Sequence, residues 1–176
     1  MRISISGHIG SGKTTVANLL GNLSGYKVYS GGYFFRKIAE EKQLTLEQLN
    51  LESEKNDDLD FKLNAMIEQF FRDHDNIIVE SRLAGCISHQ AHIKVFRVLL
   101  TASLDTRVRR VSGREAGDDI LDRVRLREES ENRRFKKFFN FDLDDKSIYD
   151  TVIDTEEGSA EEIANKIYKL AFSNSG

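Results

Sequence analysis

The sequence predicts an α/β domain in which a mostly parallel sheet carries helices on both faces. Short apolar runs alternate along the chain with longer stretches of helical periodicity, a pattern that favours parallel strands joined by right-handed crossovers. The apolar segments at 77–79 and 95–100 are typical of strands covered on both sides. A length of 176 residues, with no repeat and no obvious linker, indicates one domain over residues 1–176.

The individual elements follow from residue type and spacing. Residues 3–6 and 26–29 are short β-prone runs followed by glycine turns, and 151–153 is a further strand candidate. Apolar residues recur at helical spacing between 13 and 23, so a helix is expected there. The same pattern predicts helices at 33–42, at 46–71 with a polar break near 56–58, and at 160–172.

Composition and charge narrow the classes of function. The chain has 26 basic and 29 acidic residues, and a net charge of −3 argues against binding nucleic acid over a broad surface. The single cysteine, Cys86, excludes an internal disulfide and a zinc site made of four cysteines. No apolar run approaches the ~18 residues that span a bilayer, and the N-terminus does not have the pattern of a signal peptide. We therefore expect a cytoplasmic protein without a membrane partner.

A phosphate-binding loop is the clearest motif in the chain. Residues 7–14 read Gly-His-Ile-Gly-Ser-Gly-Lys-Thr and match G-x-x-x-x-G-K-[ST] in full, between a predicted strand and a predicted helix. Glycines let backbone N–H groups approach a nucleotide's phosphates, Lys13 reaches the β- and γ-phosphates, and the Thr14 hydroxyl holds Mg²⁺. The predicted nucleotide site consists of Gly7, His8, Ile9, Gly10, Ser11, Gly12, Lys13, Thr14 and Thr15.

Arginines are concentrated in one later part of the chain. Nine of the 14 arginines fall between 107 and 134. Arg127, Glu131 and Arg134 stand at i, i+4 and i+7 and so share one face of a helix. A solvated helix with many ion pairs is the alternative interpretation, because charge-rich helices are commonly of that kind. Phosphoryl transfer, however, requires cations around the moving group, and the planar guanidinium grips two oxygens at once.

The segment 108–118 has little apolar content and contains Arg110, Arg114 and two glycines. We interpret it as a mobile flap that closes over the phosphates and excludes water. Arg36 and Arg82 follow the second and third predicted strands, and ligands of open parallel sheets bind beyond such strand ends. Glu80, at the end of the third strand, is interpreted as a partner of the water shell of Mg²⁺.

With these residues in view, the whole chain resembles the short cytidylate kinases of archaeal type, a branch of the nucleoside monophosphate kinases. The stretches that carry the resemblance are 7–15, Ser-Gly-Gly at 30–32 with Arg36, Glu-Ser-Arg-Leu-Ala-Gly at 80–85, Arg-Glu-Glu-Ser-Glu at 127–131, and 147–155. The resemblance implies a three-layer P-loop fold with a five-stranded parallel sheet of order 2-3-1-4-5. It also implies an acceptor-binding region at about 31–75 and a lid at about 108–118.

The resemblance implies transfer of the γ-phosphoryl group of ATP, with Mg²⁺, to CMP or dCMP. By analogy, Arg36, Arg82 and Arg127 hold the acceptor phosphate, Glu131 contacts the sugar, Arg134 faces cytosine and Ser30 lies at the same site. Lys13, Arg110, Arg114 and Arg127 act on the transferred group, and residues 154–156 line the adenine. The acceptor is a phosphate oxygen that is already ionised near pH 7, so the reaction needs no catalytic base.

Two alternatives remain open on the sequence alone. One is a kinase of the same fold with another acceptor, such as an adenylate kinase. The other is a P-loop ATPase that assists ribosome assembly, but such proteins carry Asp-x-His after a strand where this chain has Glu80-Ser81-Arg82. The sequence does not separate CMP, dCMP and UMP as acceptors, and we expect a monomer.

Overall fold

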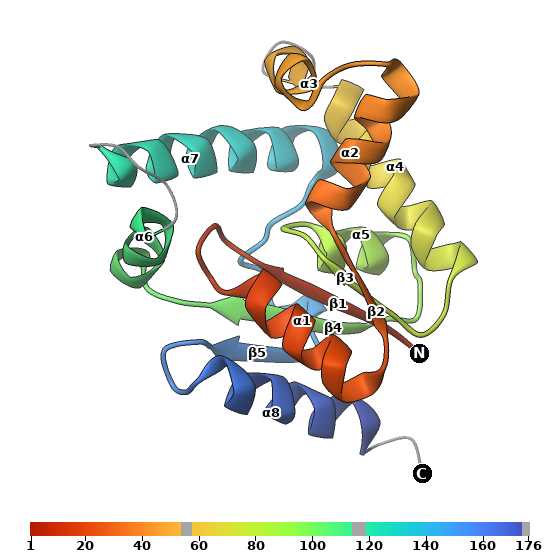
Figure 1. Ribbon diagram of the computed structural model, residues 1–176, viewed down its shortest axis with the longest axis vertical. Coiled ribbons are helices and arrows are strands. Elements are labelled where there is room, and N and C mark those ends of the chain that lie inside the picture. The colour runs from red at the N-terminus through yellow and green to blue at the C-terminus, as the bar shows by residue number, and fades with distance from the viewer. Residues whose placement is uncertain (54–57, 114–118, 174–176) are drawn as a thin grey trace.

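The computed structural model describes residues 1–53, 58–113 and 119–173. Its centre is a sheet of five parallel strands in the order β2-β3-β1-β4-β5, as expected (Figure 1). The strands are β1 (Arg2–Gly7), β2 (Lys27–Ser30), β3 (Ile77–Glu80), β4 (Phe96–Thr101) and β5 (Thr151–Asp154). Because β1 is central, the loop that follows it opens at the middle of the sheet's carboxyl edge.

Helices cover both faces of the sheet and extend beyond its carboxyl edge. They are α1 (Lys13–Ser24), α2 (Gly31–Lys42), α3 (Leu46–Ser53), α4 (Asp58–Asp73), α5 (Ala84–Gln90), α6 (Leu104–Ser112), α7 (Ile120–Phe139) and α8 (Ala160–Phe172), with a 3₁₀ turn at Lys146–Ile148. Figure 1 shows α2, α3 and α4 grouped together, and the loop after β1 directed toward α6 and α7.

The core consists of two apolar layers, one on each side of the sheet. On one side Ile3, Ile5 and Ile78 pack with α1 and α8. On the other side Ile77 and Val79, which alternate with Ile78 along β3, pack with α4 and α5. β3 is buried on both faces, which explains why its sequence is almost continuously apolar.

Most helix boundaries agree with the predictions. The helix predicted to begin at residue 33 begins at Gly31, because the Ser30 hydroxyl caps α2 by accepting a hydrogen bond from the Tyr33 N–H. α3 ends at Ser53 and α4 begins at Asp58, and the break expected near 56–58 falls mostly on residues 54–57, which lie outside the described residues. The seven-residue helix α5 was not predicted.

The first part of the segment predicted to be a flap is helical. The prediction placed the flap from 108 onward, and α6 continues up to Ser112. Ser103 caps this helix through the Thr106 N–H, and Val111 is buried, which gives the helix an apolar contact with the rest of the domain. The remainder of the proposed flap, including Arg114, lies outside the described residues.

An aromatic cluster joins β2, α2 and α4. The Tyr29 ring meets those of Phe70 and Tyr33 edge-on, at centroid distances of 4.6 and 5.2 Å. Phe34 meets Phe70 in the same way at 5.2 Å. Such pairs stabilise a fold beyond their apolar area, so the cluster holds α2 against α4. Among the described residues, no helix is both long and apolar enough to cross a bilayer.

Candidate active site

The phosphate-binding loop has the predicted context, since it follows β1 and opens α1 at Lys13. Gly10 and Gly12 have φ of +79° and +90°, values that favour glycine. A Cβ atom on Gly10 would lie 2.6 Å from the carbonyl oxygen of Arg107. Glycine is therefore required at this position both by backbone conformation and by close packing against α6.

Lys13 is half-buried at the start of α1, and its Nζ donates a hydrogen bond of 2.8 Å to the carbonyl oxygen of His8. Burial lowers the pKa of Lys13 to about 8, and the nearby Arg82 adds to this effect while the carboxylate of Glu80 opposes it. A dianionic phosphate beside the ammonium group would favour its charged form again. The site is thus arranged to receive negative charge.

Thr14 and Glu80 form the oxygen-rich corner of the site. The Thr14 hydroxyl donates a hydrogen bond of 3.0 Å to Oε1 of Glu80, at the end of β3. Burial raises the pKa of Glu80, while Lys13 and the Thr14 hydrogen bond oppose the rise. A hydroxyl and a carboxylate beside a phosphate loop are the ligand types that Mg²⁺ takes, directly or through water. The residues present therefore fit this metal.

A cavity of about 420 Å³ adjoins the loop and reaches under α2, α4 and α7. Lys13 and Glu80 form its inner end, so the phosphate loop and the cavity share a boundary. Its polar side chains beyond that end are Asp60, Asn64, Ser81, Arg82, Arg127, Glu131 and Arg134. Three of the predicted arginines are therefore brought together on the surface of one cavity.

These charged groups are arranged around Glu131, which is buried on α7. Arg82 forms an ion pair with Glu131, and Nε of Arg127 donates to the same carboxylate at 3.3 Å. Burial lowers the pKa of Arg82 to about 9, and the neighbouring charge of Arg127 adds to the effect, but the group stays protonated at neutral pH. Arg134 is held by Asp60 at 2.8 Å and by the Ser130 hydroxyl at 3.2 Å.

Arg36, Ser30 and Arg110 are not among the residues that line this cavity. Arg36 is exposed on α2, and the Ser30 hydroxyl is engaged as the cap of that helix. Arg110 donates to the Thr155 hydroxyl at 2.8 Å and to the Thr155 carbonyl at 3.1 Å, just after β5. Its guanidinium also approaches the Gly10 carbonyl at 3.4 Å, so it lies beside the phosphate loop.

Comparison with known proteins decides the family. The model of the cytidylate kinase-like family matches residues 2–157. The chain belongs to this family. A cytidylate kinase of Thermoplasma acidophilum is 44% identical over 166 residues, covering 93% of this chain and 88% of the relative. A cytidylate kinase of Methanosarcina barkeri is 37% identical over 174 residues, covering 97% and 96%.

Solved structures show that this cytidylate kinase-like chain has the fold of P-loop kinases. A shikimate kinase from Acinetobacter baumannii superposes with a TM-score of 0.65 at 17% identity, covering 98% of this chain and 93% of that one. A gluconokinase from Sinorhizobium meliloti gives 0.66 at 16% identity, covering 99% and 93%. At these identities the likeness concerns the fold alone.

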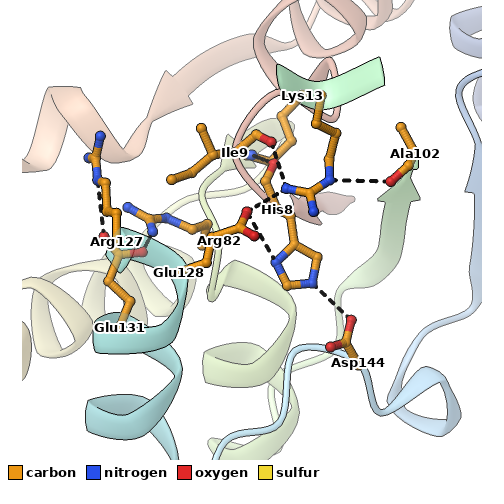
Figure 2. A network of polar contacts seen from close by, with 10 residues as sticks. His8, Ile9, Lys13, Arg82, Ala102, Arg127, Glu128, Glu131 and Asp144 are labelled. Carbon is orange, nitrogen blue, oxygen red and sulfur yellow. Dashed lines mark hydrogen bonds and ion pairs between the residues drawn. The ribbon is translucent and has the colours of Figure 1, made fainter. Parts of the chain in front are cut away.

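Sequence reasoning on this cytidylate kinase-like chain missed several residues of the site. Asp60 supplies a carboxylate to the cavity from α4. Its only signal in the sequence is that it stands one helical turn before Asn64, so that the two side chains share one face of the helix. Arg107 and Glu128 form a largely buried ion pair of 2.5 Å beside the phosphate loop, and Figure 2 shows Glu128 next to His8 of that loop. The pairing of Glu128 with Arg107 was not predicted, because spacing within α7 does not reveal contacts with α6.

Proposed function

We propose that the protein transfers the γ-phosphoryl group of ATP to CMP and dCMP, giving ADP with CDP or dCDP. The carrying observation is that the phosphate loop and an arginine-lined cavity meet at Lys13 and Glu80. A donor phosphate on the loop and an acceptor phosphate in the cavity would thus face each other. The relatives named cytidylate kinase support the same acceptor.

Positioning and charge neutralisation supply the chemistry in this proposal. Lys13 would bind the donor phosphates as it leaves the His8 carbonyl, and Arg110 would approach them from the opposite side of the loop. Mg²⁺, held by Thr14 and through water by Glu80, would neutralise charge on the β- and γ-phosphates. Arg114 is assigned to the transferred group by its place in the sequence.

The acceptor phosphate would bind to Arg82 and Arg127. Both guanidinium groups already share the Glu131 carboxylate, so they are held near each other before a ligand enters. Phosphate offers more oxygen acceptors than one carboxylate, and Glu131 would then be available to the sugar hydroxyls. Arg36 is proposed to reach the same phosphate from α2, and Ser30 to shape the entrance to the acceptor site by starting that helix.

The base would be recognised by Arg134 and Asp60 together. Cytosine presents an exocyclic amine that donates hydrogen bonds, next to a ring nitrogen and a carbonyl that accept them. A carboxylate accepts from the amine, and the guanidinium donates to the ring edge. Uracil places a carbonyl oxygen where cytosine has the amine, and that oxygen would face the Asp60 carboxylate without a proton between them. The pair therefore favours cytosine.

The donor base is assigned to the loop after β5. Thr155 follows β5, and Arg110 fastens that segment to α6. Residues 154–156 would line the adenine of ATP there. The proposal also includes one catalytic unit over residues 1–176, with an acceptor region at about 31–75 and a lid at about 108–118. The first five residues of this lid are helical. The protein is proposed to act as a monomer in the cytoplasm.

The test is ADP formation from ATP and Mg²⁺ with CMP, dCMP, UMP, AMP or GMP supplied separately, beside a reaction without acceptor. We expect strong turnover with CMP and dCMP. A preference for AMP would retain phosphoryl transfer but overturn the assignment of Asp60 and Arg134. Equal ADP release without any acceptor would overturn the kinase proposal itself.

A further inference from the structure

One carboxylate joins three separate segments beside the phosphate loop. Oε1 of Glu128, on α7, accepts a hydrogen bond of 2.5 Å from Arg107 of α6. The same oxygen lies 3.6 Å from Nδ1 of His8, in the loop itself. Figure 2 shows the His8 ring between this carboxylate and Asp144. Glu128 thus contacts the donor side of the site from a helix that lines the acceptor side.

Arg107 connects the carboxylate to the loop backbone. Its guanidinium donates to the Ile9 carbonyl at 3.1 Å and to the Ala102 carbonyl at 3.2 Å. Only 9% of its side chain is exposed, and 13% of that of Glu128. A buried cation without its anion is strongly unfavourable, so the two side chains hold α6, α7 and the loop in one arrangement.

His8 makes the second connection. While Nδ1 faces Glu128, Nε2 lies 2.9 Å from Oδ1 of Asp144, in the segment after α7. The backbone carbonyl of His8 also accepts the hydrogen bond from Lys13. A phosphate bound in the loop would compete with that carbonyl for the N–H groups of Lys13. Occupation of the loop therefore changes the contacts of the residue whose ring touches Glu128.

We propose that Glu128 is a positioning residue that couples nucleotide occupancy of the phosphate loop to the acceptor site. It precedes Glu131 by less than one turn and adjoins Arg127, so a rigid α7 transmits its position to both. Fixing Glu128 against the loop fixes the acceptor-phosphate groups relative to the donor phosphates. In-line transfer depends steeply on that alignment, whereas binding of either nucleotide alone does not. This inference rests on the proposed function.

The experiment uses the full chain and the variant Glu128→Gln, which keeps the side chain's shape and removes its charge. Glu129→Gln is the matched control, because Glu129 is the exposed neighbour on the same helix. CMP affinity is measured with and without a non-hydrolysable ATP analogue, and kcat and KM are measured for both substrates. The ratio of the two CMP affinities is the coupling factor between the sites.

We expect the analogue to tighten CMP binding to the wild-type protein at least about fivefold. In Glu128→Gln this factor should fall close to one and kcat should fall at least about tenfold, while the affinity for the analogue alone changes less than threefold. Glu129→Gln should match the wild type in every quantity. The proposal would be overturned if Glu128→Gln had the same coupling factor and kcat as the wild type. It would also be overturned if a lower melting temperature were the only change.

A second variant decides the matter if Glu128→Gln does not fold. Asp144 is 69% exposed, so Asp144→Ala should fold normally while removing the outer partner of His8. We expect it to lower the coupling factor at least about twofold with little change in melting temperature. An unchanged factor in this variant would then refute the proposal. A wild-type protein that does not phosphorylate CMP would instead refute the proposed function, which separates the two failures.

Discussion

Replacement of Asp60 by asparagine tests the cytosine-reading pair most directly. The carboxylate holds Nε of Arg134 at 2.8 Å, and the two side chains are 23% and 29% exposed. A hydrogen bond to a charged group contributes about 1.5–3 kcal/mol, and partial exposure places this one near about 1.5 kcal/mol. The cytosine amine would lose the charged Asp60 carboxylate as its acceptor, as the Arg134 guanidinium does. Since about 1.4 kcal/mol is tenfold, kcat/KM for CMP should fall roughly tenfold.

The effect on UMP should have the opposite sign. An asparagine amide can donate to the uracil carbonyl that the Asp60 carboxylate opposes, so kcat/KM for UMP should hold or rise. The CMP-to-UMP ratio should therefore fall at least about tenfold. The assay is ADP release over a range of each acceptor at saturating ATP. Asp73→Asn, on the same helix outside the cavity, is the control. Equal losses for CMP and UMP, with the ratio within about twofold of wild type, would refute this assignment.

Three further predictions concern the loop and its surroundings. The pKa of Lys13 is lowered to about 8 and phosphates favour its charged form, so ATP binding at pH 8.5 should take up protons. Calorimetry in buffers of different ionisation enthalpy should detect this proton uptake, and Lys13→Met should abolish it. Glu80→Gln should raise the Mg²⁺ concentration for half-maximal activity roughly tenfold, since a charged partner of the metal's water shell is lost; an unchanged Mg²⁺ titration would contradict its assignment. Gly10→Ala should lower the free energy of unfolding by about 2 kcal/mol more than Gly25→Ala, measured by urea denaturation. Both residues have positive φ, but nothing lies within 4 Å of a Cβ at Gly25, whereas the Arg107 carbonyl blocks a Cβ at Gly10. Equal losses of unfolding free energy in the two variants would mean that backbone conformation alone causes the destabilisation.

The fold was largely predictable because its signals are local. Apolar strands, helical spacing and the glycine-rich loop each depend on neighbours in the sequence, and the family resemblance supplied the strand order. The helical part of the expected flap was missed although Ser103 is a helix-capping residue type and Val111 lies at helical spacing from Leu104. The segment contains many arginines and few apolar residues, so its helical periodicity is weak in the sequence.

The candidate site was predictable to a different degree. Arg127, Glu131 and Arg134 were placed on one helix face, and all three line the cavity. Asp60 was not found, because its contact with Arg134 spans 74 positions and joins two helices. The ion pair between Glu128 and Arg107 was missed for the same reason. Partners that depend on tertiary packing leave little trace in the spacing of either segment.

The aromatic cluster of β2, α2 and α4 has a practical consequence for solution work. The chain has five tyrosines and no tryptophan, so its intrinsic fluorescence comes from phenol rings alone. Tyr29 and Tyr33 lie in the cluster that joins β2 and α2 to Phe70 of α4. Any displacement of α2 against α4 alters the surroundings of these two chromophores. The emission of the unlabelled wild-type protein would thus report such a displacement, and a stopped-flow instrument could follow it without a dye or a substitution.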